Sequence, residues 1–279
     1  MAAAMEDSND ANLVFTYIKT LVVTYVCLTV ALYIFIAIGI LRVNGNNSLS
    51  THQKTVLLIT AHPDDECMFF GPTLSRLTSS SNSLNRVHLL CLTNGNFYGN
   101  GLTREKEIIK SGKILGITKD RITVVNDSKL PDDPVADWPP DQVQKNIIDV
   151  VCRLKPEEVY TFDEYGVSGH KNHIAVHKAV REIFTNGTKL RGVKSVYFLQ
   201  SVNILRKYLA IFDLPLVLLR ESVIAVAAPG AVLQIEKAML AHYTQLEWFR
   251  LLYIIFSRYM TINSFTRLDL KEDKLEETD

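Results

Sequence analysis

The run His62-Pro-Asp-Asp-Glu66 brings together several side chains that can bind a metal or transfer a proton. Adjacent carboxylates repel one another, so they are tolerated together when each is well solvated or when a cation binds them. Imidazole nitrogen with carboxylate oxygen is a donor set that suits zinc and similar divalent metals. The alternative is a helix N-terminus, where acidic side chains interact favourably with the helix dipole. That alternative accounts for Asp65 and Glu66 but leaves His62 unexplained.

A second cluster follows at residues 169–177, where the sequence reads GHKNHIAVH. Residues three and four apart share a helix face, so this spacing predicts His170, His173 and His177 in one stripe. The zinc-protease pattern requires a glutamate directly after the first histidine of its pair, and Ile174 occupies that place. The cluster therefore indicates a metal site of another kind or, alternatively, a polar helix face.

Together the two clusters supply a complete catalytic metal site. A catalytic zinc takes three protein ligands and keeps one position open, and His62, Asp65 and His173 provide three. Asp64 is then free to act as the general base on a water molecule. His170 is placed to stabilise the developing oxyanion or to protonate a leaving amine. A nearby carboxylate, with Asp163 as the candidate, is expected to orient His170.

The surrounding segments alternate between short apolar runs and amphipathic stretches. The apolar runs predict strands at residues 55–60, 86–93, 122–125, 158–162 and 195–199. The amphipathic stretches predict helices at residues 66–77, 104–115, 141–154 and 170–184. Such alternation is typical of an α/β fold with a mostly parallel sheet and helices on both faces.

In a parallel sheet, ligands bind beyond the carboxyl ends of the strands. Four polar segments directly follow predicted strands, at residues 61–66, 94–101, 126–134 and 163–170. Both histidine clusters fall on these segments, so we expect them to meet at one edge of the sheet.

Residues 20–41 form an uncharged apolar stretch, flanked by Lys19 and Arg42. About 20 apolar residues suffice to cross a bilayer, so the stretch predicts one transmembrane helix. A cleaved signal peptide is the alternative, but its apolar region would be only about 7–15 residues long. The basic residues on the two flanks differ little in number and favour a cytoplasmic main domain. The predicted organisation is a flank (1–19), the helix (20–41), a linker (42–54), the α/β domain (55–264) and an acidic tail (265–279).

Composition excludes several other classes of protein. Lys and Arg together number 30, as do Asp and Glu, so the chain lacks the basic excess of a nucleic-acid-binding protein. No Cys-x-x-Cys pair supports a zinc ribbon or a thioredoxin-like site. The four cysteines are expected to be small buried apolar side chains, although they could also form two disulfide bridges. No Gly-x-Gly-x-x-Gly follows the first strand, which disfavours a nucleotide-binding domain.

The pairing of AHPDDE at 61–66 with GVSGHKNH at 166–173 resembles the LmbE-like de-N-acetylase family. Further similar segments are found at residues 68–74, 130–134, 199–208 and 248–260, and the resemblance covers about residues 57–264. It is strongest to the branch that acts on N-acetylglucosaminyl-phosphatidylinositol in the second step of glycosylphosphatidylinositol-anchor synthesis.

The resemblance implies a Rossmann-like LmbE-type domain in a single-pass endoplasmic-reticulum membrane protein whose catalytic domain is cytoplasmic. It implies zinc, or another divalent metal such as iron, bound by His62, Asp65 and His173. Asp64 matches the family's base and His170 its second catalytic histidine. Arg104 and Asp127 stand where relatives contact the sugar. Many bacterial relatives have aspartate in place of Asn172, which leaves any charge relay through that position open here.

Two alternatives remain open at this stage. Residues 246–260 place aromatic and aliphatic side chains on one broad face, which predicts either a core helix covering the sheet or a helix lying on the bilayer. The chain as a whole could also be a non-catalytic membrane adaptor that retains the deacetylase fold.

Overall fold

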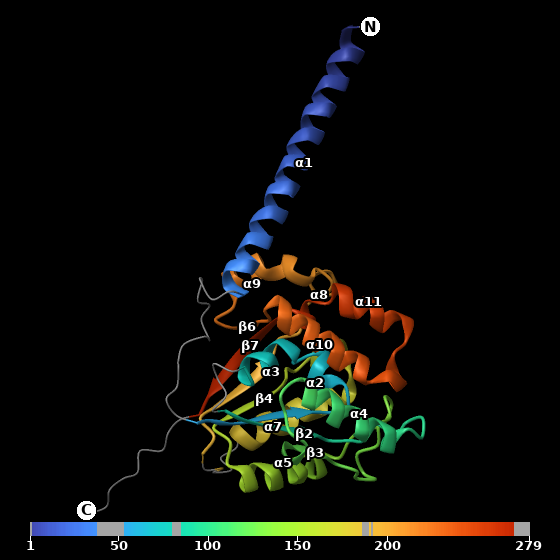
Figure 1. Cartoon of the computed structure of the whole chain (residues 1–279), viewed down its shortest axis with the longest axis vertical. Coiled ribbons are helices and arrows are strands. Elements are labelled where there is room, and N and C mark those ends of the chain that lie inside the picture. The colour runs from blue at the N-terminus through green and yellow to red at the C-terminus, as the bar shows by residue number, and fades with distance from the viewer. Residues whose placement is uncertain (1, 38–52, 80–84, 186–189, 191, 271–279) are drawn as a thin grey trace, which may run out of the picture.

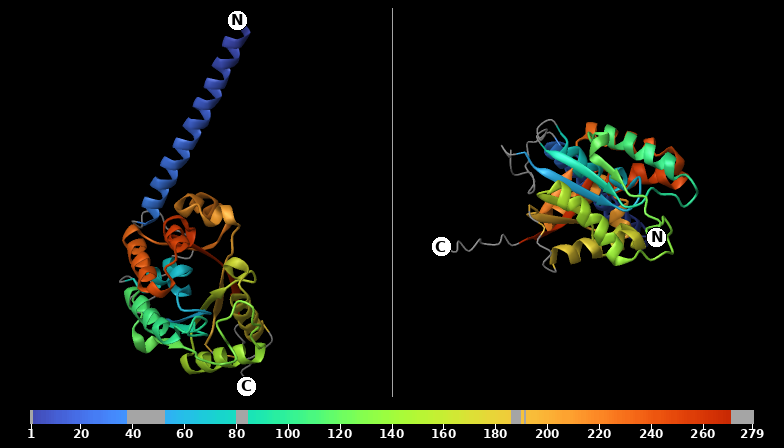
Figure 2. Two further views of the ribbon diagram at one scale, coloured as in Figure 1. Left: turned by 90° about the vertical axis from the view of Figure 1, so that its right-hand side faces the viewer. Right: turned by 90° about the horizontal axis from the view of Figure 1, so that it is seen from below.

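The computed structural model describes residues 2–37, 53–79, 85–185, 190 and 192–270. One long helix, α1 (Ala2–Ala37), projects from an α/β domain (Figure 1). Viewed at right angles, the N-terminal part of α1 again stands clear of the domain, which lies at the C-terminal end of the helix (Figure 2). The predicted helix at 20–41 lies in α1 as far as Ala37, and residues 38–41 and most of the predicted linker lie outside the described residues.

The domain is organised around a seven-stranded sheet with the order β3-β2-β1-β4-β5-β7-β6. The first five strands are parallel, as predicted, and they are β1 (Thr55–Thr60), β2 (Arg86–Cys91), β3 (Ile122–Val124), β4 (Glu158–Phe162) and β5 (Ser195–Leu199). The last two, β6 (Val223–Val226) and β7 (Ile262–Asp269), join in antiparallel orientation.

Alternating side chains of β1 enter two separate cores, because successive residues of a strand face opposite sides of a sheet. Leu57 and Ile59 pack in one core, beneath α5 (Pro140–Leu154) and α7 (Lys171–Thr185). Val56 and Leu58 pack in the other core. The helices on that side are α2 (Asp65–Met68), α3 (Gly71–Leu77), α4 (Gly101–Ile114) and α10 (Pro229–Ala241). Both faces of the sheet are therefore covered, as the sequence predicted.

The single helix predicted at 66–77 is in fact two helices, α2 and α3. The break lies at Phe69 and Phe70, and Pro72 occupies the first turn of α3, where its missing N–H is not needed. Asn263 in β7 donates to the Phe69 carbonyl (2.8 Å) and accepts from the Thr73 hydroxyl (2.7 Å). A buried polar side chain of the last strand thus holds both helices at the break.

The C-terminal part of the domain departs most from the prediction. It contains the short helices α8 (Ile204–Lys207), α9 (Leu214–Arg220) and α11 (Trp248–Phe256), besides α10 and the two antiparallel strands. The 3₁₀ segments among the described residues are η2 (Lys119–Arg121), η3 (Ala210–Asp213), η4 (Tyr243–Gln245) and η5 (Arg258–Met260). β7 includes the first residues of the range predicted as an acidic tail, and residues 271–279 lie outside the described residues.

The four cysteines are free thiols. Cys67 and Cys91 are buried, as expected, but the prediction was wrong for Cys27 and Cys152, which are exposed on α1 and α5. Both lie on outward faces of their helices, which the spacing of single cysteines does not reveal.

A buried arginine connects the C-terminal segments. Arg258 of η5 has no exposed surface, and it donates to Asp213 (2.5 Å) and to the Ser264 hydroxyl (2.8 Å). Arg206 of α8 donates to both oxygens of the same Asp213 (2.8 and 3.0 Å). Removing one partner of a buried ion pair leaves the other charge uncompensated.

We therefore expect Arg258→Met to lower the free energy of unfolding by about 3–5 kcal/mol. Denaturant unfolding of the detergent-solubilised full chain measures the change. Arg206→Met is the matched control and should cost less, because the Arg206 side chain is partly exposed. Equal stability of Arg258→Met and the unmodified chain would show that Arg258 does not stabilise the buried charge of Asp213.

Candidate active site

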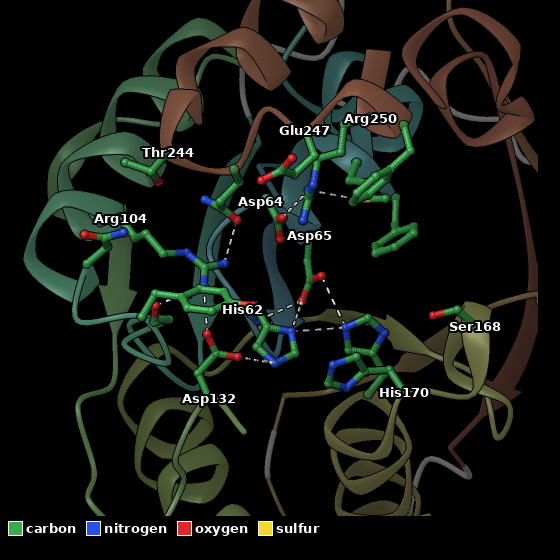
Figure 3. Close-up of a pocket in the computed structure, with 18 residues that line it drawn as sticks. His62, Asp64, Asp65, Arg104, Asp132, Ser168, His170, Thr244, Glu247 and Arg250 are labelled. Carbon is green, nitrogen blue, oxygen red and sulfur yellow. Dashed lines mark hydrogen bonds and ion pairs between the residues drawn. The ribbon is translucent and has the colours of Figure 1, made fainter. Parts of the chain in front are cut away.

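The site lies at the carboxyl edge of the parallel strands, where the sequence predicted it. A cavity of about 830 Å³ opens there, and its wall includes the segments that follow β1, β2, β3 and β4. Residues 244–250, leading into and through the start of α11, close it from the opposite side (Figure 3).

His62, Asp65 and His173 converge at the bottom of this cavity. His62 Nδ1 and His173 Nε2 are 3.3 Å apart. Asp65 Oδ1 lies 3.2 Å from His173 Nε2, and Asp65 Oδ2 lies 3.7 Å from His62 Nδ1. All three side chains are buried. The loop after β1 and the first turn of α7 are thus brought together as the sequence predicted.

The other polar atoms of these residues are held in place. The backbone amides of Ala61 and His62 donate to Asp65 Oδ2 (3.0 and 2.8 Å). His173 Nδ1 lies 3.0 Å from the Gly166 carbonyl, which it can reach only as a donor. Gly166 has φ +62°, and a Cβ there would lie 2.7 Å from His173 Cβ, so this position requires glycine. These bonds direct the Nε2 lone pair of His173 toward Asp65 and His62.

Burial and charge separate the pKa values of these groups. Burial lowers the pKa of His62 to about 4, more than the charge of Asp65 raises it. Burial also lowers the pKa of His173, but the charge and hydrogen bond of Asp65 outweigh burial and raise it above its ordinary value. Burial raises the pKa of Asp65, and the charge of His173 outweighs that effect and leaves it below its ordinary range. Asp65 is therefore a carboxylate, and His173 is its main partner.

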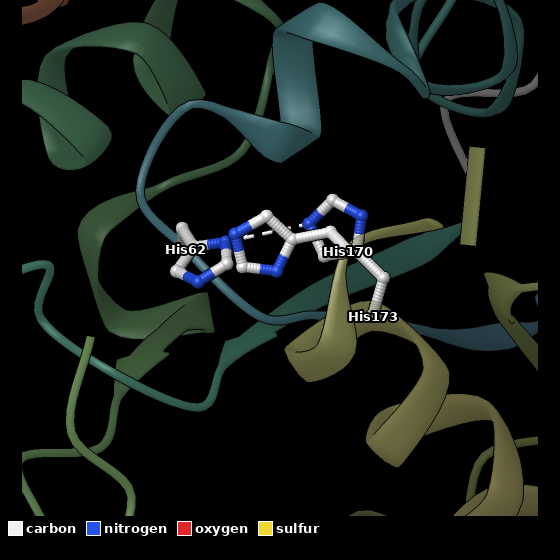
Figure 4. A group of neighbouring side chains, drawn as sticks. All are labelled: His62, His170 and His173. Atoms are coloured by element: carbon white, nitrogen blue, oxygen red, sulfur yellow. Dashed lines mark hydrogen bonds between the residues drawn. The ribbon is translucent and has the colours of Figure 1, made fainter. Parts of the chain in front are cut away.

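The donor set fits a zinc ion. Tetrahedral zinc with ligands at about 2.0–2.1 Å places its ligand atoms roughly 3.3 Å apart, close to the separations within this triad. The ring nitrogens of His62, His170 and His173 also gather within 4.8 Å of one another (Figure 4). His62 Nε2, on the far side of the ring, lies 3.3 Å from Asp132, as the outer partner of a metal-binding histidine would.

Asp64 occupies a strained position beside the triad. Its φ is +129°, outside the regions that favour non-glycine residues. Its side chain faces the cavity, where the Arg250 guanidinium donates to it (Figure 3). The charge of Asp64 raises the pKa of Arg250 further above its usual value. Strain of this kind persists where the surrounding structure enforces it, and it is frequent at functional sites.

His170 lines the cavity but does not belong to the helix. It has extended backbone just before α7, so the predicted three-histidine stripe is broken at its first member. The backbone amide of Asn172 donates to His170 Nδ1 (3.3 Å), which leaves the proton of the neutral ring on Nε2. Burial and the neighbouring His173 lower the pKa of His170.

The other expected members of this cluster lie elsewhere. His177 is buried against Phe198, with Nδ1 3.0 Å from the Phe162 carbonyl, and it does not line the cavity. Asp163, the expected partner of His170, instead accepts from the Ser201 hydroxyl and from the Gly166 amide. His177 is therefore a buried, hydrogen-bonded side chain outside the site, and not part of a polar helix face.

Arg104 and Asp127 have different surroundings. Arg104 lines the cavity and donates to Asp132 (2.7 Å), to Gln245 (2.6 Å) and to the Gly95 and Pro63 carbonyls. Asp127 is absent from the cavity wall, and its oxygens accept from Gln142, Asn146 and the Lys129 amide. Arg104 thus joins three loops of the site, whereas Asp127 stabilises the loop that carries Asp132.

Glu66 completes the run of acidic residues but points away from the cavity. Its Oε1 accepts from His242 Nε2 (2.7 Å) and from the Ser111 hydroxyl, and its Oε2 accepts from the Asp64 amide (3.0 Å). Glu66, Cys67 and His242 form a second group of potential metal donors. Both oxygens of Glu66 are already hydrogen-bonded, so we assign the group a structural role that fixes the backbone of Asp64.

Three residues that hold side chains or backbone of the site in place, Asp132, Arg250 and His242, were not predicted as site residues. Asp132 belongs to a segment that directly follows β3, and its position on the rim was a usable signal. Arg250 and His242 come from the C-terminal part of the chain, more than 170 positions from their partners Asp64 and Glu66. No local spacing indicates such contacts.

The Glu66–His242 pair should make stability depend on pH. Burial lowers the pKa of His242, but the charge and hydrogen bond of Glu66 outweigh it and raise it above 6.5. This contribution to stability is complete below the unfolded pKa and is lost as pH rises through the folded pKa. We therefore expect the unfolding temperature of the unmodified chain to exceed that of His242→Gln by more at about pH 6 than at about pH 9. A difference that stays constant or grows with pH would contradict the pairing.

The chain is similar in sequence to known proteins. Residues 57–184 match the family described as PIG-L, GlcNAc-PI de-N-acetylase. The chain is 44% identical over 214 residues to the N-acetylglucosaminyl-phosphatidylinositol de-N-acetylase of Bos taurus, covering 76% of this chain and 83% of that protein. It is 37% identical over 242 residues to a probable enzyme of the same name from Schizosaccharomyces pombe, covering 83% and 95%.

Solved structures share the fold at low sequence identity. The N,N'-diacetylchitobiose deacetylase from Pyrococcus horikoshii has a TM-score of 0.56 and 17% identity, covering 77% of this chain and 84% of that one. A 4-carboxy-2-hydroxymuconate hydratase has a TM-score of 0.51 and 14% identity, covering 78% and 98%. The fold alone therefore does not assign the reaction. The sequence relatives do assign the family, and the chain belongs to the PIG-L family of N-acetylglucosaminyl-phosphatidylinositol de-N-acetylases.

Proposed function

We propose that this chain is a zinc-dependent hydrolase that removes the acetyl group from N-acetylglucosaminyl-phosphatidylinositol, releasing acetate and leaving the free amine on the sugar. The observation that carries the proposal is the convergence of His62, Asp65 and His173 on one point, with Asp64 facing the same cavity. The names of the sequence relatives supply the substrate.

The metal would be held by His62 Nδ1, Asp65 and His173 Nε2. Bound there, zinc would polarise the amide carbonyl and lower the pKa of water. Iron suits the same donors and remains the alternative metal. Asp132, on the far side of the His62 ring, and the Gly166 carbonyl, behind His173, would keep both rings oriented.

Asp64 is the proposed general base. Its carboxylate faces the cavity without belonging to the ligand triad, so it can accept the proton of the attacking water. Its strained backbone is fixed by Glu66, whose Oε2 accepts from the Asp64 amide. Arg250, which donates to Asp64, keeps that carboxylate oriented.

His170 is the proposed donor. Its Nε2 carries the proton because Nδ1 accepts from the Asn172 amide, and the ring lines the cavity. In this position it can stabilise the developing oxyanion or protonate the leaving amine. Arg104 is the proposed sugar-binding residue, whereas Asp127 would act through the loop that positions Asp132.

We further propose that α1 crosses the endoplasmic-reticulum membrane once and that the catalytic domain is cytoplasmic. Phe15–Ile36 is long and apolar enough to span a bilayer, and most of its side chains are exposed. An anchor of this kind would hold the enzyme at the surface where a lipid-linked substrate resides.

Replacing the base should separate catalysis from metal binding. We expect Asp64→Asn to retain bound zinc and to lose about 10²–10⁴-fold in turnover, the usual contribution of a general base. Zinc content by atomic absorption and acetate released from the glycolipid are the two measurements. Loss of zinc from a folded Asp64→Asn variant would move Asp64 into the ligand set.

Replacing a ligand should remove the metal itself. We expect His173→Ala to lose zinc and activity together, because only two protein ligands would remain. His177→Ala is the matched control, since His177 is on the same helix and buried but lies outside the cavity. Equal zinc content in the two variants would reassign the site.

Activity of the purified chain distinguishes the enzyme from a non-catalytic adaptor. Chelation should abolish acetate release and zinc should restore it, because the ligand triad alone supplies no Lewis acid. A folded, zinc-loaded chain that releases no acetate from N-acetylglucosaminyl-phosphatidylinositol would favour the adaptor.

A further inference from the structure

The contact between α1 and the domain extends far along the apolar stretch of α1. Near the C-terminal end of α1, Tyr33 donates to the Ala227 carbonyl (2.8 Å). Further back along the helix, Tyr25 donates to the Phe212 carbonyl of η3 (2.5 Å). Tyr25 lies eleven residues before Ile36, where the apolar stretch ends, which is about 16 Å along the axis at 1.5 Å per residue. A side chain near the middle of the stretch proposed to cross the membrane is therefore hydrogen-bonded to the domain, and burial of α1 against the domain begins at Thr29.

The segment at this level presents apolar side chains outward. From α8 to the end of α9 the exposed side chains include Ile204, Leu205, Leu209 and Leu219, the last of them 85% exposed. Leu214 and Val217 of α9 face the opposite way and pack against α1 residues and β6. The segment thus buries one side against its own chain and leaves the other side apolar and uncovered.

The charges within the segment do not oppose contact with lipid. Asp213 of η3 is fully buried and paired with Arg206 and Arg258. Arg220 stands at the end of α9, where a long basic side chain can reach the headgroup layer. The acidic residue of the segment is therefore neutralised inside the protein.

Helix α11 continues this apolar surface. Trp248, 73% exposed, is one of six exposed apolar side chains among its nine residues, the others being Phe249, Leu251, Leu252, Ile255 and Phe256. Its single charged residue, Arg250, turns inward to Asp64. Lys207 of α8 lies 5.7 Å from the Tyr253 ring of α11, so the two helices are neighbours, and both lie at the α1 end of the domain (Figures 1 and 2).

We propose that α8, η3, α9 and α11 form a membrane-inserting surface that seats the domain in the leaflet beside α1. The structure favours a lipid bilayer as the partner of this surface. The surface lies beside the apolar stretch of α1, so a membrane that surrounds that stretch would also meet the surface. Phe249 and Arg250 of α11 also line the cavity. Insertion of α11 would therefore place the cavity mouth at the lipid headgroups. The inference rests on α1 crossing a membrane and is independent of the reaction catalysed.

Tryptophan fluorescence tests the proposal without any activity measurement. The chain has two tryptophans, Trp248 on α11 and Trp138, which is 5% exposed and lies beside His62. The full chain is placed, one copy per nanodisc, in lipid whose acyl chains carry bromine, a quencher that acts at short range. The same protein in unbrominated lipid gives the reference emission.

We expect brominated lipid to remove most of the emission of Trp248. The unmodified chain should therefore lose fluorescence in brominated lipid, and the Trp248→Phe variant should not. In the Trp248→Phe background, Leu219→Trp should restore quenching, and Cys152→Trp should not. Position 152 is the matched control because it is exposed on α5, at the end of the domain far from α1 (Figure 1). Near-ultraviolet circular dichroism confirms that each variant is folded.

Two results would overturn the proposal. The first is a folded chain in which Trp248 and the Leu219→Trp variant are quenched no more than the Cys152→Trp variant. That outcome would assign the apolar surface to a protein partner or a second copy. The second is quenching only by bromine attached at the headgroup, which would place the surface outside the hydrocarbon.

Discussion

The carboxylate of Asp65 is the interaction on which the rest of the site depends. One oxygen is fixed by the backbone amides of Ala61 and His62, and the other lies 3.2 Å from His173. Because those amides directly follow β1, the position of the carboxylate is set by the sheet. A buried carboxylate needs such partners to remain charged. The same charge raises the pKa of His173 and so joins the first strand to the helix after β4.

Around that charge, adjacent residues of one short run serve separate purposes. Asp65 faces the histidines, Asp64 faces the cavity and Arg250, and Glu66 faces the buried His242 and Ser111. The positive φ of Asp64 makes this division possible, since it turns the chain between two acidic side chains. The three carboxylates thus avoid mutual repulsion by having different partners, which explains why the run is tolerated in a buried place.

The sequence predicted the parts of the structure that depend on local pattern. Three of the five parallel strands have the predicted bounds, and His62, Asp65 and His173 meet as expected because each follows a strand or begins a helix on one edge. The strand β7 was missed because Asn263 and Ser264, polar and buried, interrupt its apolar pattern, whereas β6 was missed although its four residues are all apolar. Arg250 and His242 could not be foreseen, because their roles arise only when the C-terminal segment folds over the cavity. For residues 246–260, the exposed face of α11 excludes the core-helix alternative over Trp248–Phe256, whereas residues 257–260 are buried.

X-ray absorption at the zinc edge of the loaded full chain tests the central claim most directly. The account predicts only nitrogen and oxygen neighbours at about 2.0–2.2 Å, with the multiple-scattering signature of imidazole, from His62, His173 and Asp65. A sulfur neighbour at about 2.3 Å would contradict it, because the cation would then lie at Cys67 with Glu66 and His242.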